Sequence, residues 1–246
     1  MPLPLALEEN FSAFVRRFGG QVVADILGPS PDHPNADYFF PRQAVVAELK
    51  CLEDDKREDQ QLQTKVQAHF DRWMADGTIP IYYGDSVRVE SKTLPAACQH
   101  ALLEIYKPPI QRRILKANKQ IKATAQRLRL ESYRGLLLLA NDGNYALEAD
   151  AVMYLVWRIL GRSFQNITNV VYFTVNMPAT HPTTPKPCLV MARVQRNHLE
   201  CIDPAFIQDL TSGWIKYFEE LVGEPVEEVH LDGLEELSRL RYETRA

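Results

Sequence analysis

Apolar residues recur along the chain at two spacings, one typical of helices and one typical of strands. Between residues 7 and 18 the apolar side chains follow a helical period, and two glycines come next, which predicts a first amphipathic helix. The segments 21–27 (QVVADIL), 36–40 (ADYFF) and 44–52 (AVVAELKCL) are rich in β-branched and aromatic residues, and each predicts a strand. The short gap between the last two predicts an antiparallel hairpin.

Helical and strand-like patterns alternate through the rest of the chain. We expect the helix over residues 98–130 to break at residues 108–109, which are both proline. We also expect an exposed, irregular loop over the proline-rich residues 178–187. This mixed order predicts an α/β protein with a mixed central sheet flanked by helices. The helical segments are 54–75, 98–130, 147–160, 204–222 and 232–241, and the strands are 79–91 (two short ones), 135–140, 169–175 and 188–195.

Composition narrows the class of protein. The chain has 246 residues, of which 46% are hydrophobic and 24% charged, with a net charge of -4, as is typical of a globular protein with a real core. Its four cysteines, at 51, 98, 188 and 201, lack zinc-ligand spacing, so we expect reduced thiols. The N-terminus lacks the pattern of a signal peptide, and no segment is suited to cross a bilayer. We therefore expect a soluble, cytoplasmic protein without a membrane partner.

Candidate chemistry lies in the third predicted strand. Glu48 and Lys50 are two residues apart, so their side chains share one face. If the hairpin turns at residues 42–43, Asp37 lies directly opposite Glu48 on that face. Two carboxylates so close repel, so one is protonated or a cation lies between them, and a hard divalent ion prefers such oxygen ligands. The alternative is a solvated strand face with an incidental ion pair.

Asp37, followed after ten intervening residues by Glu48-Leu49-Lys50, resembles the PD-(D/E)XK signature of the restriction-endonuclease-like nuclease superfamily. The predicted order helix–strand–strand–strand–helix is similar to the core of that superfamily, and the resemblance covers about residues 5–75. Ala36 stands where the family usually has proline. The resemblance implies that Asp37 and Glu48 bind Mg²⁺ (or Mn²⁺), with the Leu49 carbonyl as a further ligand. It implies that Lys50 orients or deprotonates the attacking water.

Further residues join the site in some members of that superfamily. The resemblance implies a glutamate from the first helix, either Glu8 or Glu9, with Glu8 nearer the apolar face. It also implies a glutamine from the next helix, and Gln60, Gln61 and Gln63 are all available. The alternative for each is an exposed helix residue.

A basic segment offers a surface for a polyanion. Residues 105–130 carry eight Lys or Arg and no acidic residue, which suits a nucleic-acid backbone. The alternative is that this helix packs on the acidic residues 203–236, within the chain or across a homodimer. The candidate nucleic-acid-binding residues are Lys107, Arg112, Arg113, Lys116, Lys119 and Lys122.

These features lead to a hypothesis of a metal-dependent nuclease that acts on DNA. We expect residues 1–96 to form the nuclease-like core and residues 97–246 to hold the basic helix and further α/β elements, with a single domain as the alternative. Bacterial defence or DNA processing fits such a domain by analogy of fold alone. The alternative functions are a catalytically inactive nuclease-like protein that binds nucleic acid or a protein partner, and an unrelated α/β hydrolase.

Overall fold

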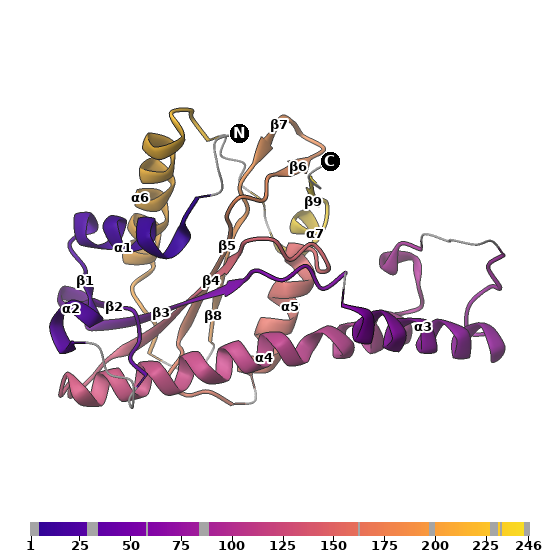
Figure 1. Cartoon of the computed structure of the whole chain (residues 1–246), viewed down its shortest axis with the longest axis horizontal. Helices are drawn as coiled ribbons and strands as arrows, with labels where there is room; N and C mark the ends of the chain where they lie inside the picture. The colour runs from indigo at the N-terminus through magenta and orange to yellow at the C-terminus, as the bar shows by residue number, and fades with distance from the viewer. Residues whose placement is uncertain are drawn as a thin grey trace.

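A mixed six-stranded sheet forms the centre of the protein (Figure 1). The computed structural model describes residues 5–28, 34–57, 59–83, 89–161, 163–196, 200–226, 231 and 233–243. The strand order is β1-β2-β3-β4-β5-β8, in which β3, β4 and β5 run parallel and the other neighbours antiparallel. The strands are β1 (Gln21–Val22), β2 (Tyr38–Phe40), β3 (Val45–Leu52), β4 (Arg134–Asn141), β5 (Asn169–Thr174) and β8 (Met191–Gln195). The predicted α/β class with a mixed sheet is confirmed.

Helices cover both faces of the sheet (Figure 1). On one face, α1 (Leu7–Phe18) and α6 (Pro204–Val222) pack through an aromatic cluster in which the rings of Phe11 and Trp214 are 4.7 Å apart. On the other face, α4 (Ala96–Arg127) and α5 (Ala149–Leu160) pack on an aliphatic core. Both cores and the sheet draw on residues from both sides of position 96.

Strand β3 shows how the pattern of the sequence fixes the two faces. Val45, Ala47 and Leu49 belong to the core under α1 and α6, whereas Val46 and Leu52 belong to the core under α4 and α5. Because side chains alternate along a strand, residues 48 and 50 point to the α4 face.

Helix α3 (Gln60–Ala75) projects from the body together with the residues that follow it (Figure 1). A small third core stabilises this projection, with Trp73 and Ile79 packed near Leu94 and Cys98. A short 3₁₀ turn (Ser91–Thr93) leads back into α4. The helix after β3 therefore does not cover the sheet, and α4 takes that place.

Several predictions of local structure were wrong. The segment 21–27 is a strand only over β1, which pairs with Phe39 and Tyr38. The Val23 N–H still donates to the Asp37 carbonyl at 2.8 Å, and the chain then continues as helix α2 (Val23–Leu27). The predicted helix 54–75 begins only at Gln60, because Asp59 caps it through bonds from the next turn. Residues 79–83 form no strand, and the second strand predicted there falls largely on residues 84–88, outside the described residues.

Two predictions that rested on prolines were wrong. Helix α4 runs unbroken through Pro108, which is exposed, and Pro109, which is half-buried. The loop predicted over 178–187 holds β6 (Ala179–His181) and β7 (Thr184–Cys188), which pair as a hairpin. This is possible because β7 is an edge strand, where proline is tolerated. A third strand, β9 (Arg241–Tyr242), follows the short helix α7 (Gly233–Leu237) and completes this small sheet.

No disulfide bond joins any two of the four cysteines at 51, 98, 188 and 201. In the part of the chain that the structure describes, no helix has both the length and the apolar character that crossing a bilayer requires.

Candidate active site

The β2–β3 hairpin brings the three candidate residues together. Tyr38 pairs with Ala47 and Phe40 with Val45, and continuing this register by one residue places Asp37 opposite Glu48. The predicted register is thus confirmed. The turn itself is a 3₁₀ turn (Pro41–Gln43) followed by Ala44 in the left-handed region at φ 51°. Alternation of apolar residues determines the register here, although the turn is not of a favoured two-residue type.

The Asp37 side chain replaces a backbone hydrogen-bond acceptor where the pairing of β2 with β3 ends. Its Oδ2 accepts a hydrogen bond from the Leu49 backbone N–H at 2.8 Å. The carboxylate therefore occupies the position that a further residue of β2 would fill. On its other side β3 is paired with β4 along its whole length, so Glu48 is held on a rigid strand at the point where β2 leaves it.

Glu48 is fully buried, with an exposed fraction of 0%. Lys50 Nζ donates a hydrogen bond to Glu48 Oε1, and the Lys50 side chain is itself only 15% exposed. Glu48 Oε2 receives no hydrogen bond from any donor in the described residues. A buried carboxylate oxygen without a donor is costly, and this one needs a proton or a cation.

Both carboxyl groups resist ionisation. Burial, followed by the charge of Asp37, raises the pKa of Glu48 to about 8, against the opposing charges of Lys50 and Lys116. Burial also raises the pKa of Asp37, and the hydrogen bond from the Leu49 N–H and the charge of Lys50 oppose this rise. Each carboxyl group therefore favours its protonated form more than an exposed carboxyl group does, and a bound cation would reverse that preference.

The donor set fits Mg²⁺, which proteins often bind through one or two carboxylates while water and substrate oxygens complete the octahedron. Asp37 and Glu48 supply two such groups, and the unpaired Glu48 Oε2 is available as a ligand. Among the described residues, no group of three or more His, Cys, Asp or Glu side chains forms a metal site. A bound ion would thus depend on this pair, on backbone oxygen and on water.

A cavity of about 270 Å³ leads to Asp37. Its walls include Glu8 and Ser12 of α1, together with Tyr38 and Leu49. Glu8 is exposed, and its charge contributes to the raised pKa of Asp37.

Of the other sequence candidates, Glu9 does not line this cavity. Gln60, Gln61 and Gln63 lie at the start of α3, in the part of the molecule that projects beyond β3 (Figure 1). None of the three lines the cavity.

A glutamine that the sequence pattern did not single out lies near the candidate site. Gln120 of α4 is only 7% exposed, and its Nε2 donates to the Asn35 carbonyl at 2.8 Å, whereas its Oε1 has no partner among the described residues. A polar residue inside the apolar stripe of Ala117 and Ile121 was the available signal. Gln120 and Thr124, which accepts the Ala36 N–H at 2.6 Å, tie α4 to the residues just before Asp37.

The six candidate nucleic-acid-binding residues of α4 divide into two groups. Lys107 forms an ion pair with Glu104 at 2.7 Å, and the half-buried Arg113 donates from Nε to the Cys51 carbonyl at 2.6 Å. The other four are exposed and form no ion pair within the described part of the chain, and we call them the basic face: Arg112, Lys116, Lys119 and Lys122.

Helix α6, the first part of the acidic segment 203–236, does not cover the basic face. It lies across the sheet from α4 (Figure 1), and its Glu220 binds Arg17 of α1. Residues 227–230 and 232 of the segment lie outside the described residues, so a contact of the rest of the segment with α4, within the chain or across a homodimer, stays a prediction.

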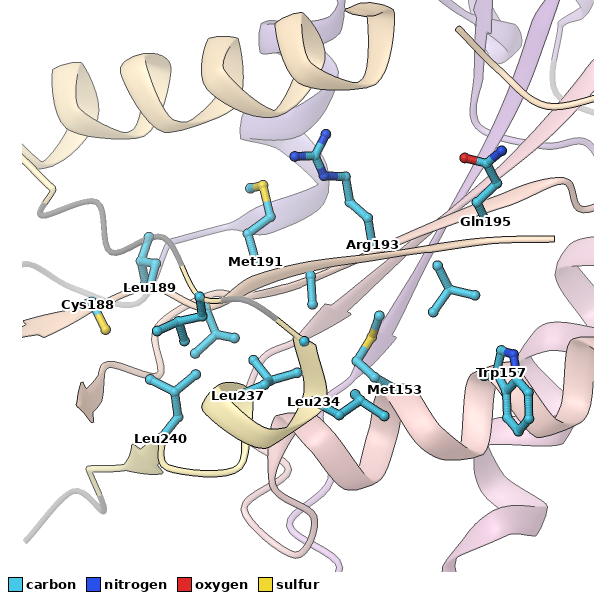
Figure 2. A pocket seen from close by; sticks show the side chains of 15 residues that line it. Met153, Trp157, Cys188, Leu189, Met191, Arg193, Gln195, Leu234, Leu237 and Leu240 are labelled. Atoms are coloured by element: carbon cyan, nitrogen blue, oxygen red, sulfur yellow. The ribbon is translucent and has the colours of Figure 1, made fainter. Parts of the chain in front are cut away.

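A larger cavity, of about 590 Å³, lies at the opposite edge of the sheet, between β8, α5 and α7. Figure 2 shows that side chains such as Met153, Leu234 and Leu237 line it. Among the described residues, the lining holds no carboxylate, lysine or histidine, in contrast to the Asp37 cluster.

No protein-family model matches the chain, and no curated protein or solved structure matches it either. The residues of the site themselves are thus the basis for a functional inference.

Proposed function

We propose that the protein is a Mg²⁺- or Mn²⁺-dependent phosphodiester hydrolase, a nuclease that acts on DNA. One observation carries this proposal. The buried Glu48 has one oxygen on Lys50 and the other without a donor, beside the carboxyl group of Asp37. This arrangement of two carboxylates and one amine on a strand is suited to hold a divalent ion next to a cationic side chain.

Each residue has a distinct role in the proposed reaction. Asp37 and Glu48 would hold the ion in their ionised forms, and the ion when bound would acidify water and offset charge on the phosphate. Lys50, already beside Glu48 Oε1, orients the attacking water and stabilises negative charge that develops on the phosphate oxygens. The mostly buried position of Lys50 strengthens that interaction, because the surrounding dielectric is low.

The basic face supports a nucleic acid as the substrate. Arg112, Lys116 and Lys119 follow helical spacing on α4 and leave their charges without an acidic partner among the described residues. Such a row of cations binds phosphates and releases counterions. The choice of DNA over RNA, and a role in bacterial defence or DNA processing, rest on the resemblance to PD-(D/E)XK enzymes.

Cleavage of supercoiled plasmid DNA in Mg²⁺ or Mn²⁺ tests the proposal. We expect Asp37→Asn, Glu48→Gln and Lys50→Ala each to lower the cleavage rate by about 100-fold or more, the usual scale for loss of a group active in the transition state. EDTA should abolish cleavage.

Matched controls are Asp209→Asn and Lys65→Ala, which change an exposed carboxylate of α6 and an exposed lysine of α3. Both should cleave like the wild type. Cleavage that survives Glu48→Gln and Lys50→Ala would reject this site.

A second function, binding without catalysis, is favoured by one observation. With its pKa at about 8 and its side chain fully buried, Glu48 is mostly protonated at neutral pH. The metal-free site therefore offers no ionised Glu48 carboxylate to a metal ion. A protein that binds DNA, loses affinity steeply with added salt and never cleaves it would fit this alternative.

A further inference from the structure

Strand β8 is the last strand of the central sheet and has an open edge. It pairs with β5, and no other strand of the described residues lies on its outer side. The Val190 carbonyl and the Arg196 N–H each form a hydrogen bond on the β5 side. Because such bonds alternate along an antiparallel pair, the backbone N–H and C=O groups of Met191, Arg193 and Gln195 face outward.

The cavity of about 590 Å³ runs along this open edge. Its lining includes every residue of β8, together with Met153 and Trp157 of α5 and Leu234 of α7. Trp157 is 59% exposed and Leu234 is 49% exposed. Ala192 and Val194 of β8 pack against the aliphatic core on the same side. Large apolar side chains that stay exposed along a groove are typical of a surface that binds another chain.

The two faces of β8 differ in chemistry. Figure 2 shows Arg193 on one side of the strand and Met153 and Trp157 on the other. Arg193 is exposed, and its guanidinium donates to Gln208 Oε1 at 2.9 Å but forms no ion pair with the described residues. A strand added at this edge therefore meets a cation on one face and apolar side chains on the other.

We propose that the outer edge of β8 binds an extended peptide segment of a partner protein, in which an acidic residue lies between two apolar residues. Antiparallel pairing places the acidic residue opposite Arg193 and the apolar residues opposite Ala192 and Val194, because directly opposed side chains share a face. The peptide backbone bonds to the outward-facing groups of β8, as in other complexes where a peptide adds a strand to a sheet. The alternation of its side chains provides the specificity.

A second copy of the chain fits this edge less well. Antiparallel pairing of two β8 strands that uses the outward groups of Met191, Arg193 and Gln195 together places two Arg193 side chains opposite each other. Like charges directly opposite destabilise a strand pair. Charge complementarity thus favours a partner segment that carries an acidic residue.

Selection from a phage-displayed library of random short peptides tests the proposal, with the immobilised full-length protein as the target. We expect the enriched peptides to share the apolar–acidic–apolar pattern. Arg193→Glu should instead enrich peptides with Lys or Arg at the middle position, because the cross-strand charge is reversed. The same pattern from both proteins, or no enrichment by the wild type, would overturn the proposal.

Fluorescence polarisation of one enriched peptide then measures the contribution of the groove. Trp157→Ala should weaken binding by about 10-fold, as for loss of an aromatic anchor in an interface. Leu115→Ala is the matched control, because Leu115 is 41% exposed on α4 and does not line the cavity, and it should bind like the wild type. Equal thermal midpoints would show that both variants fold.

Methylation of the peptide's backbone nitrogens tests strand addition itself. A peptide methylated at alternate residues loses the N–H groups that pair with β8, so one of the two possible alternate sets should abolish binding. Unchanged affinity for both sets would contradict strand addition.

Light scattering at the protein concentration of these assays distinguishes the peptide from a second copy as the occupant. The molar mass of the protein should be the same for the wild type and Trp157→Ala. A wild-type dimer that becomes a monomer in Trp157→Ala would show that a second copy fills the edge of β8, and the proposal would then fail.

Discussion

At the residue scale, the protein keeps an ionisable carboxyl group where water does not reach. Glu48 is at 0% exposure, and burial is the main cause of its raised pKa. The native state therefore binds a proton that the unfolded chain releases near the ordinary pKa of glutamate. Stability then falls with rising pH wherever the native state holds more protons than the unfolded state.

This predicts a pH-dependent stability for the metal-free protein. The contribution from a neutral Glu48 is fully present below its unfolded pKa, near 4.5, and is lost as the pH rises towards its native pKa of about 8. Urea unfolding in EDTA should show the free energy of unfolding decline across this window. Glu48→Gln, which cannot ionise, should lose most of that decline, and identical profiles for both proteins would contradict the assignment.

At the element scale, the sequence correctly predicted the strand register and the strands that depend on the alternation of apolar residues. The β2–β3 register and the central strand β4 came out as expected, because a slip by one residue would turn Val46 and Ala47 to the wrong faces. Local signals failed where tertiary contacts decide. The segment 21–27 becomes helix α2 after Val22, α4 keeps two prolines, and Gln120 approaches the site from a helix distant in sequence.

A close contact at the start of β4 gives a test at this scale. A Cβ atom on Gly135 would lie 1.8 Å from the backbone oxygen of Asn166. Gly135→Ala should therefore force the strand and the loop apart and lower the free energy of unfolding by about 1–3 kcal/mol, as overpacking does. Gly161→Ala is the matched control, because its Cβ would meet its nearest neighbour at 3.5 Å in a helical conformation at φ -60°. Denaturant titration measures both, and equal stabilities would show that the loop yields without cost.

At the scale of the whole molecule, the sheet lies between the basic face of α4 and the acidic helix α6. The basic face of α4 lies on one side, and α6, with Glu220 bound to Arg17, lies on the other. The sequence revealed both charge clusters but not their separation, because only the strand order decides which helices share a face. The candidate site lies where the sheet meets the basic side.

Binding of an ion should stabilise the whole fold, because the unfolded chain does not hold Asp37 beside Glu48. With Mg²⁺ at about 100 times its Kd, we expect about 2.7 kcal/mol of added stability, seen as a rise of the thermal midpoint that EDTA reverses. The rise should grow from pH 6 to pH 8, because Glu48, with its pKa raised to about 8, must lose its proton before it can bind the ion. A Glu48→Gln protein that gains as much from Mg²⁺ as the wild type would show that the ion binds elsewhere.

The parallel pairing of β3 with β4 also determines when the site is assembled. Every residue from Val45 to Leu52 has its neighbour in Arg134–Asn141, which emerges from the ribosome only after α3 and α4 are complete. A nascent chain that ends before β4 carries Asp37, Glu48 and Lys50 but lacks the frame that aligns them. The proposed site can therefore form only after β4, in the second half of the chain, has been synthesised.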